Sequence, residues 1–88
     1  MRSYGCIGKQ LLRSDTSVAA NFRAYTRGKS KAERFAKICI VVEEADETLF
    51  WLELLEEVAL IDISIFANLK QEALELLKIF SSTKFNLK

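Results

Sequence analysis

The amino-acid sequence predicts an all-α protein, an antiparallel up-and-down helical bundle organised around one long central helix. Three observations predict this fold class. The 88 residues include no proline, and all three glycines lie in the first third, so little interrupts a helix after residue 28. Apolar residues recur every three or four positions, which is helical spacing. Half of the residues are apolar, so a single domain, residues 1–88, can bury a core.

The first helix is expected from about Lys9 to Tyr25, after an irregular segment over residues 1–8. The polar stretch at residues 14–17 is expected to loosen or restart it, because such side chains compete for backbone hydrogen bonds. Asn21 lies among apolar neighbours and is expected to form a hydrogen bond between helices. Gly28 is expected to end the helix with a left-handed cap. The apolar stripe of this helix consists of Leu11, Val18, Phe22 and Tyr25.

The second helix should begin at a capping box, in which Ser30 and Glu33 satisfy two backbone amides, and should run to about Ala59. Apolar residues line two nearly opposite faces of this helix, so each face needs a cover. One face is predicted to lie in the bundle core and comprises Phe35, Ile38, Val42, Ala45, Leu49 and Leu52. The other is predicted to be an oligomer interface and comprises Ile40, Trp51, Leu54 and Val58.

A third helix should follow a short connection over residues 60–63, with Asp62 or Ser64 as its N-terminal cap. Its tail over residues 81–88 is expected to be frayed. Together the three helices carry more apolar surface than a three-helix monomer easily buries, so we predict a homo-oligomer. The apolar stripe of the third helix consists of Phe66, Leu69, Ala73, Leu76 and Phe80, with Leu77 beside it.

Candidate catalytic chemistry is lacking in the sequence. There is no histidine, which removes the usual general base and the Ser–His and Cys–His nucleophile pairs. The carboxylates at residues 43–47 are interpreted as a solvated face or as ion-pair partners, because nothing beside them completes a metal coordination shell. We therefore predict a protein that is not an enzyme, with no cofactor, no metal site and no small-molecule substrate.

The sequence also bears on the cellular compartment. Cys6 and Cys39 have no paired spacing, and Lys9 and Arg13 lie where a signal peptide would need an apolar stretch. The longest aliphatic run, residues 38–42, is too short to span a bilayer. We therefore expect a cytoplasmic protein with reduced thiols and no membrane partner.

Charge is arranged in blocks, although the net charge is only +1. Residues 1–37 carry nine basic and two acidic side chains, whereas residues 38–66 carry eight acidic side chains and no basic one. A basic set around the first connection predicts binding of RNA or DNA through phosphates, without reading of base sequence. The alternative is a structural or protein-docking module, whose basic and acidic blocks pair with each other, between subunits above all. The candidate nucleic-acid-binding residues are Arg23, Arg27, Lys29, Lys31, Arg34 and Lys37.

Several short motifs together resemble one known family. Residues 10–14 read Gln-Leu-Leu-Arg-Ser, and residues 16–21 read Thr-Ser-Val-Ala-Ala-Asn. Ser30-Lys31 follows, and then come Glu-Ala-Asp-Glu-Thr at residues 44–48 and Trp-Leu-Glu-Leu-Leu at residues 51–55. With this combination, over about residues 4–80, the chain resembles the four-helix bundle proteins encoded by intervening sequences of 23S ribosomal RNA genes.

The resemblance implies an antiparallel bundle that assembles into a ring, typically a homopentamer, and it offers no catalytic residue to carry over. It also implies a fold similar to the accessory protein of diversity-generating retroelements, a basic ring that binds nucleic acid and a reverse transcriptase. In the family a helix precedes the segment that matches residues 4–10, whereas only Met1-Arg2-Ser3 precedes it here. The resemblance therefore implies three helices of a four-helix pattern, with the first helix missing.

Overall fold

The computed structural model describes residues 2–58 and 63–87, with side chains described for residues 5–57 and 67–87. The described residues form three helices, α1 (Arg2–Thr26), α2 (Lys31–Val58) and α3 (Ile63–Leu87). Within these ranges there is no strand, so the all-α prediction is confirmed. The long central helix predicted from the sequence is α2.

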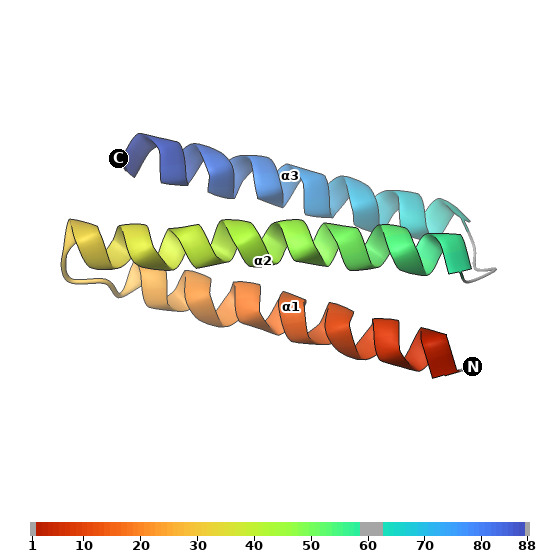
Figure 1. Ribbon diagram of the computed structural model, residues 1–88. Coiled ribbons are helices and arrows are strands. Elements are labelled where there is room, and N and C mark those ends of the chain that lie inside the picture. The colour runs from red at the N-terminus through yellow and green to blue at the C-terminus, as the bar shows by residue number, and fades with distance from the viewer. Residues whose placement is uncertain (1, 59–62, 88) are drawn as a thin grey trace.

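The three helices lie side by side, with α2 in the middle and α1 and α3 on either side of it (Figure 1). Consecutive helices run in opposite directions, so the C-terminal end of α3 lies at the same end of the molecule as the α1–α2 connection (Figure 1). The molecule extends 45 × 22 × 14 Å along its principal axes. Among the described residues, no Cα atom of α1 comes within 8 Å of one in α3. Helix α2 therefore has a helix along each of two flanks, while α1 and α3 stay apart.

Both outer helices are longer than the sequence predicted. Residues 2–8 are helical instead of irregular, and residues 81–87 continue α3 instead of forming a frayed tail. Helix α1 also passes unbroken through residues 14–17. The hydroxyl groups of Ser14 and Thr16 each donate a hydrogen bond to a carbonyl oxygen in the preceding turn. These side chains thus bond along the helix and do not interrupt it.

The start of α3 also corrects one expectation. Ser64 lies inside α3, which begins at Ile63, so it is not the N-terminal cap. The other candidate, Asp62, and the predicted end of the second helix at Ala59 lie outside the described residues.

Further along, α3 is joined to α2 by an ion pair between Lys70 Nζ and Glu56 Oε1, 3.0 Å apart. The hydrogen bond that Lys70 donates to Glu56 within this pair raises the pKa of Lys70.

Helix α2 begins with the predicted cap, with one difference in detail. The backbone N–H of Glu33 donates to Ser30 Oγ at 3.0 Å, as a capping box requires. The carboxylate of Glu33 accepts from the backbone N–H of Lys29 at 2.9 Å, one residue before the cap residue itself. Two amides at the helix entrance are satisfied, so the α1–α2 connection has a defined geometry.

Gly28 does not form the predicted left-handed cap, because no described residue, glycine included, has a positive φ. A glycine is required at this position because the Arg34 residue lies too close to leave room for a side chain. A Cβ atom at Gly28 would lie 2.5 Å from Arg34 Cγ and 3.3 Å from the backbone nitrogen of Arg34. The Arg34 guanidinium lies over the same turn and donates from Nη1 to the Gly28 carbonyl oxygen at 3.3 Å.

We expect Gly28→Ala to lower the free energy of unfolding by about 1–3 kcal/mol, the usual cost of overpacking. The same substitution in an Arg34→Ala background should cost less, because the Cγ atom that the new methyl group meets is gone. Urea denaturation of the four proteins in this double-mutant cycle measures the difference. Equal costs in both backgrounds would show that the Arg34 side chain is not the obstacle.

The core lies where all three helices meet. Its buried residues are Ile38, Val41 and Ala45 of α2 and Phe80 of α3. The predicted core face of α2 is confirmed by the burial of Ile38, Ala45 and Leu52, whereas Val41 was not predicted to be in it. Partly buried residues from all three helices pack around this cluster: Val18, Tyr25, Phe35, Val42, Leu77 and Leu87.

Candidate functional site

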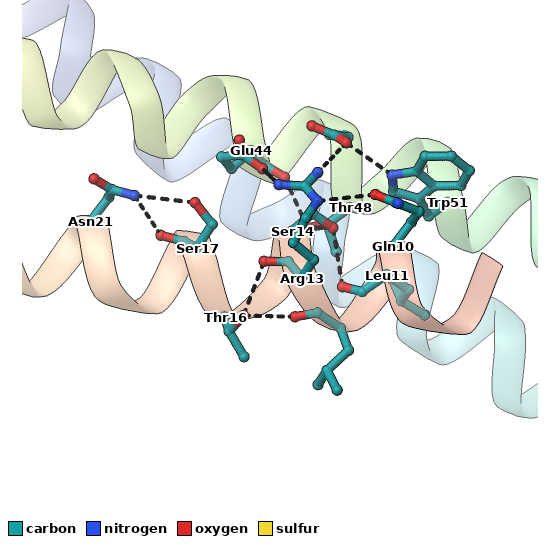
Figure 2. A network of polar contacts seen from close by, with 12 residues as sticks. Gln10, Leu11, Arg13, Ser14, Thr16, Ser17, Asn21, Glu44, Thr48 and Trp51 are labelled. Carbon is teal, nitrogen blue, oxygen red and sulfur yellow. Dashed lines mark hydrogen bonds and ion pairs between the residues drawn. The ribbon is translucent and has the colours of Figure 1, made fainter. Parts of the chain in front are cut away.

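A buried pair of hydroxyl groups joins α1 to α2 (Figure 2). Thr48 Oγ1 lies 3.0 Å from Ser14 Oγ, and both residues are buried, Ser14 completely. The Ser14 hydroxyl donates onward to the Leu11 carbonyl oxygen at 3.1 Å. Because a buried hydroxyl without a partner is costly, this pair favours one alignment of the two helices. No described side chain has a buried polar atom without a hydrogen-bond partner.

Beside this pair, Arg13 of α1 reaches two carboxylates of α2 (Figure 2). Its guanidinium lies 3.3 Å from Glu44 Oε2 and also forms an ion pair with Glu47. Glu47 in turn accepts from the indole N–H of Trp51 at 3.1 Å. The hydrogen bond from the Trp51 indole lowers the pKa of Glu47 most, followed by the hydrogen bond from Arg13. In turn, the hydrogen bond to Glu47 raises the pKa of Arg13. We call the six residues of these two contacts the α1–α2 clasp: Arg13, Ser14, Glu44, Glu47, Thr48 and Trp51.

The clasp draws its members from three of the short motifs that identified the family resemblance, those at residues 10–14, 44–48 and 51–55. Its chemistry is structural, because each polar group is used in a contact within the chain. The clasp also occupies two of the acidic residues that the sequence offered as partners for the basic set. Among the described residues Asn21 makes no such contact between helices: its amide donates to the carbonyl and hydroxyl oxygens of Ser17, within α1.

The lowered pKa of Glu47 predicts how the stability of the folded protein depends on pH. A carboxyl group with a lower pKa in the folded state contributes stability above its unfolded pKa, near 4.5, and loses it as the pH falls through the folded value. Glu47→Gln should therefore flatten the loss of stability below about pH 4.5. Urea denaturation at pH 7 and at several values below 4.5 measures this, with Asp46→Asn, an exposed neighbour, as the control. Parallel pH profiles for Glu47→Gln and wild type would contradict it.

The six predicted nucleic-acid-binding residues lie together at the end of the molecule that carries the α1–α2 connection (Figure 1). Arg23 and Arg27 come from the end of α1 and its exit, and the others from the connection and the start of α2. Among the described residues no side-chain nitrogen of the six lies within 4.0 Å of a carboxylate oxygen. Four are exposed, namely Arg23, Arg27, Lys29 and Lys31, and two are half-buried, namely Arg34 and Lys37. We call these six residues the basic end.

The predicted oligomer face of α2 is partly covered by the chain itself. Ile40, Trp51 and Leu54 are half-buried, and the side chain of Val58 lies outside the described residues. The ring of Trp51 packs edge-on against Phe50, with 5.0 Å between ring centroids. Phe50 is more than half exposed and was not among the predicted interface residues. Among the described large apolar side chains of α2, Phe50 is the most exposed.

A groove that the sequence did not predict lies between α1 and α3, with α2 as its floor. Its volume is about 420 Å³. Two leucines that the sequence placed on the buried stripe of the third helix, Leu69 and Leu76, are 43% and 48% exposed along its α3 wall. Leu12, on the α1 wall, is 65% exposed. The one sequence feature related to this groove is Leu12, an apolar residue that lies outside the predicted apolar stripe of the first helix.

Two properties of the described residues bear on other functions. No group of three or more His, Cys, Asp or Glu side chains in these ranges is placed to hold a metal ion. Over the same ranges no helix combines the length and apolar character needed to cross a membrane. Cys6 is exposed and Cys39 is half-buried, and both are free thiols.

Two comparisons with known proteins identify the same family. The family model for the 23S rRNA-intervening sequence protein matches residues 3–82. A crystal structure of a protein of unknown function from the S23 ribosomal protein family of Bacteroides thetaiotaomicron superposes with a TM-score of 0.83 and 35% sequence identity. The match covers 89% of this chain and 72% of that one. The curated proteins give no match.

Proposed function

The chain belongs to the family of 23S rRNA-intervening sequence proteins, and we propose that it is a non-enzymatic, oligomeric helical bundle that binds RNA or DNA through the phosphate backbone. The observation that carries this proposal is the basic end, where six cationic residues belong to one end of the molecule and none forms an ion pair with a carboxylate among the described residues. Cations that are not neutralised within the chain attract polyanions and release their counterions on binding.

The arrangement of acids supports the same reading. Of the acidic residues in the middle block, Glu44 and Glu47 are paired with Arg13, and Glu56 is paired with Lys70. Glu33, the one acidic residue between Arg23 and Lys37 in the sequence, accepts a hydrogen bond from the backbone N–H of Lys29. Three acids of the middle block thus join neighbouring helices, and the basic end keeps its charge for an external partner in the cytoplasm.

Charge reversal tests the proposal. With a fluorescein-labelled RNA of about 20 nucleotides in 50 mM salt, Arg23→Glu with Arg27→Glu should weaken binding at least about tenfold. The slope of log K against log salt should also become shallower by about 1.4, the contribution of two phosphate contacts on a single strand. Fluorescence anisotropy measures both quantities.

The matched control is Lys9→Glu with Lys78→Glu, which makes the same change in net charge at two exposed residues outside the basic end. It should weaken binding by less than the Arg23–Arg27 pair does. If the two double variants behave alike, the basic end has no special role, and if wild type does not bind RNA or duplex DNA in low salt, the proposal is wrong.

A second candidate function is a docking module whose charge blocks pair between subunits. It is favoured by the exposed carboxylates of α2, such as Asp46 and Glu53, which have no cationic partner among the described residues. Sedimentation velocity separates the two functions. If Arg23→Glu with Arg27→Glu breaks the oligomer, the charges serve assembly, whereas nucleic-acid binding requires an oligomer that survives. We propose that the assembly forms through the outer face of α2, where Phe50 lies beside Trp51.

A further inference from the structure

The C-terminal end of α3, which carries Phe85, lies at the same end of the molecule as the basic end (Figure 1). Near this end Leu87 borders the same small hollow as Lys31 and Phe35 of α2. Phe85 lies two residues before Leu87, about 3 Å along the helix axis. Its side chain is 73% exposed, the largest fraction among the large apolar side chains that the structure describes. An aromatic ring therefore faces solvent within one helical turn of a residue that borders the basic end.

The other aromatic residues described at this end have their rings engaged. Phe22 stacks on Tyr25, with 5.7 Å between ring centroids, and meets Phe80 at 5.3 Å. Tyr25 and Phe35 pack against the core cluster to which Phe80 belongs. Among the described residues Phe85 has no such ring partner. Phe85 is thus the ring at this end that is open to a ligand.

Cations flank this ring. Lys84 precedes it in α3, and Lys31 lies at the start of α2 beside Leu87. Among the described residues neither lysine forms an ion pair. An exposed aromatic ring beside unpaired cations is the arrangement with which proteins bind single strands, because the cations hold phosphates while an unpaired base stacks on the ring. A duplex offers no such base, since its bases are stacked on each other and paired.

Phosphate contacts alone predict the opposite preference. A duplex has the higher density of charge, and each contact contributes about 0.9 to its salt slope, against about 0.7 on a single strand. Cations that act only on phosphates therefore favour the duplex. A base stacked on an aromatic side chain strengthens binding roughly 5- to 150-fold, and only an unpaired base can gain it. The preference between the two forms thus reports whether the ring takes part.

This inference rests on the proposed function: we propose that the basic end, with Phe85 as its stacking platform, binds single-stranded nucleic acid in preference to a duplex. The bound strand places its phosphates on the basic end and on Lys84, and one of its bases on the ring of Phe85. Every base of RNA and DNA has such a face, so the preference holds for both nucleic acids.

The test uses the 88-residue chain and a labelled strand of about 20 nucleotides without internal pairing, either alone or annealed to its complement. In about 150 mM salt, wild type should bind the single strand at least about fivefold more tightly than the duplex. Fluorescence anisotropy measures both affinities, once with RNA strands and once with DNA strands.

Two substitutions at Phe85 separate stacking from apolar contact. Phe85→Leu keeps an apolar side chain without an aromatic face, so it should weaken binding of the single strand at least about fivefold and change duplex affinity less than about twofold. Phe85→Trp should retain the wild-type preference. The matched control is Phe50→Leu, the same change at a phenylalanine that is 54% exposed and lies about 28 Å along α2 from Lys31. It should leave the ratio of the two affinities unchanged.

Stacking on Phe85 is overturned if wild type binds both probes equally or prefers the duplex, or if Phe85→Leu weakens both alike. In each of these cases the phosphate-binding function stands. If wild type binds neither probe even in low salt, the proposed function itself is wrong, and this inference fails with it.

Discussion

Ile38→Ala is expected to lower the free energy of unfolding by about 2–5 kcal/mol, which is a large part of the stability of a chain of this size. Ile38 is completely buried. It belongs to the cluster in which α2 meets Phe80 of α3 and Val18 of α1. Removing three carbon atoms here leaves a cavity that side chains of three helices would all have to fill.

The control for this prediction is the same substitution at an exposed position. Ile79 lies in the middle of α3 and is 59% exposed, so Ile79→Ala should change stability by no more than about 0.5 kcal/mol. Urea denaturation followed by circular dichroism compares the two variants. If they are equally stable, the cluster at Ile38 is not the core of the folded protein.

The second large effect concerns salt. If four to six cations of the basic end neutralise phosphates, log K for duplex DNA should fall against log salt with a slope between about −3.6 and −5.4. Between 50 and 200 mM salt the affinity should therefore fall roughly 10² to 10³-fold. The effect is large because each phosphate contact releases a counterion, and all the contacts respond to salt together. Anisotropy titrations at five salt concentrations determine the slope.

The salt slope also distinguishes electrostatic binding from other modes. A slope near zero would indicate a contact dominated by apolar stacking, which the geometry does not favour. Tyr25 and Phe35, the two aromatic residues between Arg23 and Lys37 in the sequence, both pack against the core, and Tyr25 also stacks on the ring of Phe22. The basic end therefore lacks a stacking platform at those positions, and phosphate contacts remain as the source of affinity for duplex DNA.

Local sequence predicted those elements that depend on neighbours along the chain. The capping pair Ser30 and Glu33 formed at the start of α2, because its donors and acceptors lie within one turn. The basic end was also predictable, since its six residues fall within one short stretch around a connection. The helical period placed Ile38 and Ala45 in the core for the same reason.

The end of α3 was mispredicted because a hydrogen bond within the helix and a tertiary contact together extend it. Thr83 donates from its hydroxyl to the Ile79 carbonyl oxygen within α3, so the polar tail continues the helix. Leu87 then packs against the core cluster, which holds the last turn in place. Neither contact is visible as a local signal, because a hydroxyl residue is compatible with both a helix end and a helix interior.

The groove could not be predicted from the sequence, because it depends on how far apart α1 and α3 lie. Leu69 and Leu76 have the spacing of a buried stripe, and nothing in that spacing tells which stripe lacks a cover. The clasp was likewise hidden, since Arg13 and Glu47 come from opposite sides of a connection and carry no local pattern. Such sites require the packed arrangement of the helices.

The most direct test of the proposed function maps the nucleic-acid contact residue by residue. Amide chemical shifts of the ¹⁵N-labelled protein, titrated with a short RNA in low salt, should change in residues 23–37. Amides of the acidic part of α2, residues 43–57, should stay unchanged, because carboxylates repel the phosphates. Shifts confined to residues 43–57 or to the groove, with residues 23–37 unaffected, would contradict the account.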